Sequence, residues 1–89
     1  YAAQNIRVNA VCPGLIVTDL NRNSPHLQPM IDLTPARRSG EAEEVAQLVL
    51  YLASPAARFV TGEDFLIVGG FIAGAAYRHV AVRTGLLPE

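Results

Sequence analysis

The residues best placed to do chemistry lie around a Pro-Gly pair, Pro13 and Gly14, in the stretch IRVNAVCPGLIVTD at positions 6–19. The apolar, β-branched run before the pair is typical of a strand buried on both faces of a parallel sheet. The pair is predicted to end this strand, because proline removes a ladder donor and glycine permits unusual backbone conformations. Ligands of open parallel sheets bind beyond the carboxyl ends of the strands. Thr18 then supplies the first hydroxyl at a ligand edge, or alternatively is only a turn hydroxyl.

Few other side chains suggest catalysis or metal binding. The single cysteine, Cys12, lies inside the apolar run and is interpreted as a small buried hydrophobe, with a reactive thiol as the alternative. His26 and His79 have no partner at the spacing of metal ligands, so surface roles are expected for both. The sequence therefore predicts no catalytic residue and no metal ligand in this chain.

A helix and a second strand are predicted to position the turn. The helix covers residues 40–54 and ends before Pro55, and it begins with glutamates that complement the helix dipole. Its apolar side chains recur at i, i+3, i+4 and i+7 and form one stripe: Val45, Leu48, Val49 and Leu52. The second apolar strand covers residues 65–68 and ends at Gly69-Gly70. Strand, helix and strand make a βαβ unit, which indicates the α/β class.

Polar residues near these elements have simple structural interpretations. Asn5 suits the left-handed position that ends a helical turn, and Asn9 is expected to make structural hydrogen bonds inside the strand pattern. Arg37 and Arg38 either meet an anionic group of a cofactor or substrate, or form a solvated pair or a salt bridge with Glu43 or Glu44.

Two segments show little periodicity. Residues 19–39 are polar and contain three prolines, and they directly follow the expected ligand edge. Long irregular loops are commonly lids or binding loops, so a substrate lid is predicted, with a mobile connector as the alternative and short helical turns allowed over residues 27–33. Residues 71–89 are rich in small residues and then basic and loose, and they are predicted to be a C-terminal tail that either packs on a neighbour or extends into solvent.

Composition limits the classes of function. An apolar fraction of 51% argues against disorder, and a net charge of −1 gives no reason to expect nucleic acid as a partner. No apolar stretch is long enough for a membrane span and no signal peptide is evident, so the default expectation is a cytoplasmic protein. The chain begins with Tyr1 rather than methionine, which suggests a piece of a longer polypeptide. It contains no lysine, which excludes any mechanism that needs an ammonium group from this chain.

Five short features follow one another along the chain in a fixed order. They are IRVNAVCPG, a threonine four residues after its glycine, RRSGEAEEVA, LYLASPAARFVTG and a strand ending in Gly-Gly. This series resembles the C-terminal third of the short-chain dehydrogenase/reductase family, whose Rossmann-like doubly wound sheet binds NAD or NADP. The resemblance implies that residues 1–89 are the C-terminal fragment of one such domain and supply its last two parallel strands and their crossover helix. It further implies that Pro13, Gly14, Ile16 and Thr18 bind the nicotinamide end of the cofactor, the last two through its carboxamide.

The resemblance also shows what this chain does not supply. The family's Gly-rich phosphate loop is not found, and its Tyr and Lys four residues apart cannot be formed here, since Tyr1, Tyr51 and Tyr77 are followed at that offset by Asn5, Pro55 and Ala81. Val68 stands where many members carry an aspartate. The chain alone is therefore predicted to be inactive, although the parent enzyme transfers a hydride between nicotinamide and a carbonyl or alcohol of a small molecule.

The expected partners follow from the open faces of a two-stranded sheet. One βαβ unit covers only one face, so the chain is predicted to be unstable as an isolated monomer and to associate with the remainder of its domain or with another subunit, in a homo-oligomer. The alternative hypothesis is a non-catalytic oligomerisation module derived from the same fold. Neither nucleic acid nor a membrane is expected as a partner.

Overall fold

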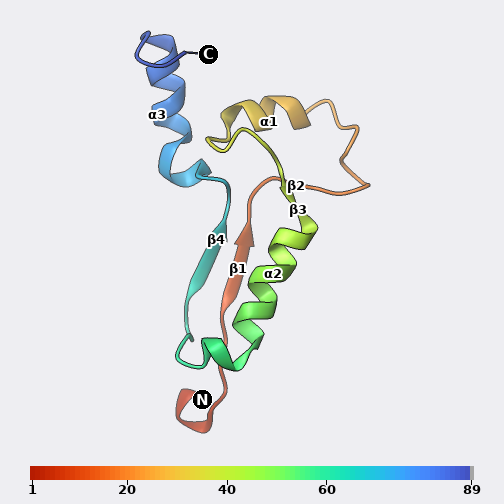
Figure 1. Cartoon of the computed structure of the whole chain (residues 1–89), viewed down its shortest axis with the longest axis vertical. Coiled ribbons are helices and arrows are strands. Elements are labelled where there is room, and N and C mark those ends of the chain that lie inside the picture. Colours follow the sequence, from red (N-terminus) through yellow and green to blue (C-terminus); the bar gives the residue numbers. More distant parts are fainter. Residues whose placement is uncertain (89) are drawn as a thin grey trace.

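Two parallel strands at the centre of the molecule set its architecture (Figure 1). The computed structural model describes residues 1–88, apart from the side chains of residues 75–80. With η denoting a 3-10 helix, the elements in chain order are η1 (Ala2–Gln4), β1 (Ala10–Pro13), β2 (Ile16–Val17), α1 (Leu27–Leu33), β3 (Gly40–Glu41), α2 (Ala42–Ala53), η2 (Pro55–Ala57), β4 (Asp64–Ile67) and α3 (Phe71–Arg83).

The two apolar segments pair side by side as β1 and β4. Their register runs from Ala10 opposite Asp64 to Pro13 opposite Ile67, and the pairing is parallel. Helix α2, which lies between them in the chain, contacts β1 along its length (Figure 1). The predicted parallel arrangement of these segments is therefore confirmed, and both strands end at the same edge of the sheet.

A second, very short parallel sheet was not expected from the sequence. Ile16 and Val17 of β2 pair with Gly40 and Glu41 of β3, and the Gly40 N–H donates to the Leu15 carbonyl at 2.8 Å. Because these backbone groups are used in the ladder, the helix predicted from Gly40 begins only at Ala42. The small sheet fastens the start of α2 to the segment that follows the Pro-Gly turn.

The apolar stripe of α2 is narrower than its periodicity indicated. Leu52 is buried with 8% exposure, and Val45 and Leu48 are half-buried. Val49, which was expected in the stripe, is exposed, because only the face toward β1 is covered. Among the described side chains the buried hydrophobic residues are Val17, Leu52 and Ala57.

The molecule has an extended shape, consistent with its small core. The radius of gyration is 16.6 Å, whereas a compact domain of this length would have roughly 12 Å. Large apolar side chains such as Leu20, Phe59 and Leu66 are exposed. Little apolar surface is thus removed from water within the chain itself, so burial alone stabilises it weakly.

The segment expected as a C-terminal tail, residues 71–89, is helical for most of its length. Residues 71–83 form α3, which packs against α1 through its N-terminal part. Backbone hydrogen bonds cap the end of the helix, among them those from the Gly85 N–H to the Val82 carbonyl at 3.2 Å and from the Leu86 N–H to the Ala81 carbonyl at 2.8 Å. Alanine-rich composition favours this helix even though it lacks a clear apolar stripe.

The structural roles expected for two asparagines are confirmed. Asn5 follows η1 with φ 63° and ψ 26°, in the left-handed region. Asn9 donates to the Val60 carbonyl at 3.0 Å and accepts from the Glu63 N–H at 3.2 Å. Asn9 therefore joins the start of β1 to the loop that leads into β4.

Candidate functional site

The turn after β1 is held tightly against the end of β4. The Gly14 N–H donates to the Ile67 carbonyl at 3.0 Å. A Cβ added at Gly14 would lie 3.1 Å from the Val68 Cα, closer than most real contacts of this kind. Glycine is needed here because the backbones of the two strand ends approach each other, and this approach brings the Pro13-Gly14 turn to the carboxyl edge of the sheet.

Beyond the turn, the backbone around β2 binds a side-chain amide. The Asn21 carboxamide accepts from the Thr18 N–H at 2.7 Å and donates to the Ile16 carbonyl at 2.9 Å. The Asn21 side chain is half-buried, while Thr18 is exposed. The strand end at Ile16 and Thr18 thus presents a hydrogen-bond donor and an acceptor in a register that fits a primary carboxamide.

A pocket of about 370 Å³ opens beside the same turn. Its lining residues come from the end of the sheet, from α1 and its C-terminal flank, and from the start of α3. Its lining carries no charged side chain and consists of Pro13, Gly14, Leu15, Met30, Thr34, Val68, Phe71 and Ile72. Residues from the predicted lid, from the turn and from the segment after β4 therefore meet at one place.

The predicted lid is anchored at its C-terminal end. Residues 27–33 form α1, where the sequence allowed short helical turns. Thr34, which follows α1, is 4% exposed and donates its hydroxyl to the Met30 carbonyl at 2.8 Å. The Ala36 N–H donates to the Gly69 carbonyl at 3.0 Å. These contacts connect the lid segment to the end of β4.

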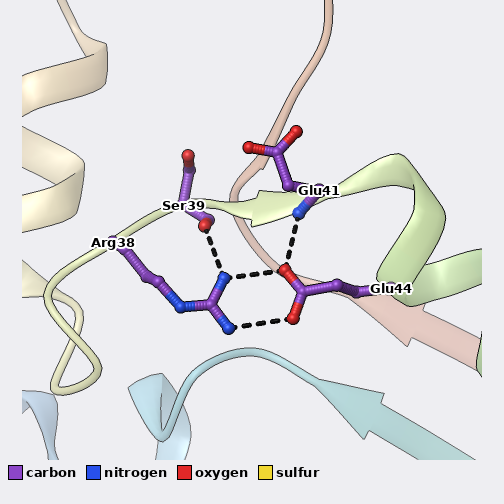
Figure 2. Close-up of polar contacts among 4 residues, drawn as sticks. All are labelled: Arg38, Ser39, Glu41 and Glu44. Atoms are coloured by element: carbon purple, nitrogen blue, oxygen red, sulfur yellow. Dashed lines mark hydrogen bonds and ion pairs between the residues drawn. The ribbon is translucent and has the colours of Figure 1, made fainter.

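The arginine pair before α2 is part of the scaffold. Arg38 forms two parallel hydrogen bonds with the Glu44 carboxylate, at 2.7 and 2.8 Å, and Glu44 also accepts the Glu41 N–H at 3.0 Å (Figure 2). The salt bridge expected as one alternative is therefore confirmed for Arg38. Arg37, the residue before Arg38, is exposed and has φ 60°.

This ion pair makes the stability of the fold sensitive to acid. The hydrogen bond from Arg38, with the one from the Glu41 N–H, lowers the pKa of Glu44 from 4.5 to about 2. Since the folded pKa is depressed, ionised Glu44 stabilises the fold fully above pH 4.5, and this contribution is lost as the pH falls to about 2.

In urea unfolding at pH 5 and pH 2.5, we expect Glu44→Gln to lose less stability between the two pH values than the wild type. Glu43→Gln, which changes an exposed glutamate of the same turn, should retain the wild-type dependence; an identical loss in both variants would contradict the assignment.

Two other candidates, His26 and Cys12, take no part in this site. His26 is exposed, and the His79 side chain lies outside the described part of the chain. Cys12 is a free, half-buried thiol within β1. Within the described residues, no group of three His, Cys, Asp or Glu side chains is arranged to hold a metal ion, and no helix is both long and apolar enough to span a bilayer.

Sequence reasoning missed two residues of this region, Asn21 and Thr34. Asn21 stands three residues after Thr18, a spacing at which asparagine often bonds nearby backbone groups, so its role had a local signal. Thr34 had none, because its side chain lies against Gly69, which follows the distant strand β4.

Comparison with known proteins gives this site its context. The family model described as enoyl-(acyl carrier protein) reductase matches residues 1–72, four fifths of the chain. This chain belongs to the short-chain dehydrogenase/reductase family. Homologues in this family are NAD(P)-dependent oxidoreductases with an α/β, Rossmann-like fold.

Individual relatives of this family member are similar over most of its length. A tropinone reductase homologue of Arabidopsis thaliana is 44% identical over 72 residues, which cover 80% of this chain but 27% of that protein. The solved structure of 4-hydroxyisoleucine dehydrogenase complexed with NADH is 37% identical with a TM-score of 0.71, covering 81% of this chain and 31% of the other. A putative 2-deoxy-D-gluconate 3-dehydrogenase from Agrobacterium tumefaciens with bound NADP is 33% identical with a TM-score of 0.74, at the same coverage of 81% and 31%. The chain thus spans about a third or less of these relatives.

Proposed function

We propose that this chain is the C-terminal part of an NAD(P)-dependent oxidoreductase domain and forms the nicotinamide side of its active site. In this role Pro13 and Gly14 lie against the nicotinamide end of the cofactor. Ile16 and Thr18 bind its carboxamide, and residues 19–39 cover the substrate. The short coverage of the relatives and the exposed apolar side chains around β1 and β4 support a chain that works with the rest of such a domain.

The observation that carries the proposal is the carboxamide already bound at this strand end. The Asn21 amide occupies one backbone donor and one backbone acceptor, those of Thr18 and Ile16. Nicotinamide carries the same primary carboxamide, and the Thr18 hydroxyl is exposed beside these groups. The residues present therefore fit the nicotinamide end of NAD or NADP.

The residues of this chain would bind and orient the nicotinamide and shield the substrate from water, and they would not transfer protons. When bound, the nicotinamide supplies or accepts the hydride exchanged with a carbonyl or alcohol carbon. The uncharged pocket beside the turn would hold part of a small-molecule substrate and keep water from it. The chain has no lysine, and we assign the catalytic Tyr and Lys to the remainder of the domain. We accordingly expect the 89 residues alone to be inactive.

Replacing Thr18 by valine tests this assignment. Valine has a similar shape but no hydroxyl, so it removes one hydrogen bond to the carboxamide and leaves the Thr18 N–H in place. One such bond contributes about 0.5–1.5 kcal/mol, which corresponds to roughly two- to twelvefold in Kd. Calorimetric titration of the protein at its full natural length with NADH and NADPH should show this weakening.

Thr18→Ser is the matched control, because it retains the hydroxyl and should bind the cofactor like the wild type. Equal affinity of Thr18→Val and the wild type would remove Thr18 from the cofactor site. Saturable micromolar binding of NADH or NADPH by the isolated 89-residue chain would contradict the proposal that the rest of the domain is required.

A second candidate role, as an association module, is favoured by the outer face of α2. Val49, Leu50 and Tyr51 are exposed there, although they are large and apolar. A surface of this kind is typical of a contact with another protein segment. Sedimentation of the protein over a range of concentrations separates the two roles, since a dimer that forms without any cofactor binding would favour association alone.

A further inference from the structure

The Asn21 side chain affects cofactor binding if, as proposed above, Ile16 and Thr18 bind the nicotinamide carboxamide. Its primary carboxamide is the same chemical group as the carboxamide of nicotinamide. It accepts from the Thr18 N–H at 2.7 Å and donates to the Ile16 carbonyl at 2.9 Å. One residue thus uses the donor and the acceptor of the strand end to which the cofactor carboxamide is assigned.

We propose that Asn21 competes with the nicotinamide carboxamide for the Thr18 N–H and the Ile16 carbonyl, and that its side chain must turn away before the cofactor is held fully. The exchange replaces two intramolecular hydrogen bonds by two to the ligand, so the carboxamide contributes less affinity than it would at a free strand end. The apparent Kd equals the intrinsic Kd divided by the fraction of the protein in which Asn21 leaves these two groups free. Asn21 is therefore a residue that sets cofactor affinity in this protein.

The surroundings of Asn21 allow such an exchange. The backbone turn survives without the side chain, since the Asn21 and Arg22 N–H groups both donate to the Thr18 carbonyl, at 3.2 and 3.0 Å. The neighbouring Leu20 is almost fully exposed, so a released amide would be hydrated. Turning the side chain away costs its two hydrogen bonds but creates no buried, unsatisfied polar group.

The test compares ligands with and without the carboxamide. Calorimetry on the protein at its full natural length gives Kd for NADH, NADPH and ADP-ribose, or its 2′-phosphate if NADPH is preferred. Asn21→Ala frees the strand end, and we expect roughly three- to tenfold tighter binding of the dinucleotide, as for a competitor that occupies most of the free protein. Binding of ADP-ribose, which lacks nicotinamide, should not change. Asn23→Ala, which removes an exposed asparagine two positions away, should leave both ligands unaffected.

Each outcome separates competition from a structural role. Unchanged or weaker dinucleotide binding in Asn21→Ala, or an equal change for ADP-ribose, overturns the inference while the proposed function stands. If the alanine variant is unstable, Asn21→Leu provides the same test, because this side chain of similar shape can neither accept from the Thr18 N–H nor donate to the Ile16 carbonyl. A wild-type protein that binds neither NADH nor NADPH would overturn the proposed function itself.

Discussion

Gly69→Ala should destabilise the fold by about 2–4 kcal/mol, combining a left-handed backbone conformation with steric overlap. Gly69 has φ 60°, and a Cβ there would lie 2.9 Å from the Thr34 Cγ2 and 3.2 Å from the Ala36 Cβ. Thr34 is buried and hydrogen-bonded, so it cannot easily move aside. Because the overlap would separate the proposed lid from the end of β4, we also expect a higher KM for substrate. Urea unfolding and steady-state kinetics on the protein at its full natural length measure the two effects.

Gly62→Ala is the control for this variant. Gly62 has φ 76°, but a Cβ there would have no heavy atom within 4 Å. It therefore has the backbone strain without the overlap, and it should cost about 1–2 kcal/mol without a change in KM. Equal losses of stability in the two variants would show that steric overlap with Thr34 does not contribute to the destabilisation by Gly69→Ala.

Leu52→Ala should cost about 2–4 kcal/mol, since it removes most of a buried leucine side chain and leaves a cavity. Leu52 is among the few hydrophobic residues that are buried in the described part of the chain. It lies in the last turn of α2, which Figure 1 shows at the end of the sheet opposite the Pro-Gly turn, so its loss should loosen the packing of α2 on the sheet. The free energy of unfolding from urea titration measures the effect.

Leu50→Ala is the matched variant on the same helix. Leu50 is 64% exposed, and a surface substitution of this type usually changes stability by about 0.5 kcal/mol or less. If the outer face of α2 contacts a partner, the Leu50 variant should weaken association rather than folding. Comparable destabilisation by the two alanine variants at low protein concentration would contradict the burial pattern of α2.

The sequence predicted well those elements whose formation depends on residue type and spacing over a few positions. The apolar runs that became β1 and β4, the helix ended by Pro55, and the left-handed Asn5 all follow from residue type and spacing. The salt bridge of Arg38 was one of the stated alternatives, and the structure selected Glu44 as its partner. The assignments of Pro13, Gly14, Ile16 and Thr18 to the cofactor remain predictions that rest on the family.

Features that depend on distant contacts were predicted less well. The composition of residues 71–89 predicts a tail, whereas packing on α1 and capping bonds define helix α3 over most of this segment. Val49 fits the helical period but is exposed, because periodicity says nothing about how wide a face the neighbouring strand covers. The β2 and β3 pairing joins two-residue segments, which are too short to have a recognisable pattern.

By itself, the sequence determined the two parallel apolar strands, the helix between them and the Pro-Gly turn that ends the first strand, because apolar patterning and backbone chemistry act over a few residues. Only the tertiary structure decided that Asn21 bonds the groups around β2 and that Thr34 is buried against the end of β4. Such contacts depend on where the turns place side chains in space, and that placement follows from packing between segments that are remote in the chain.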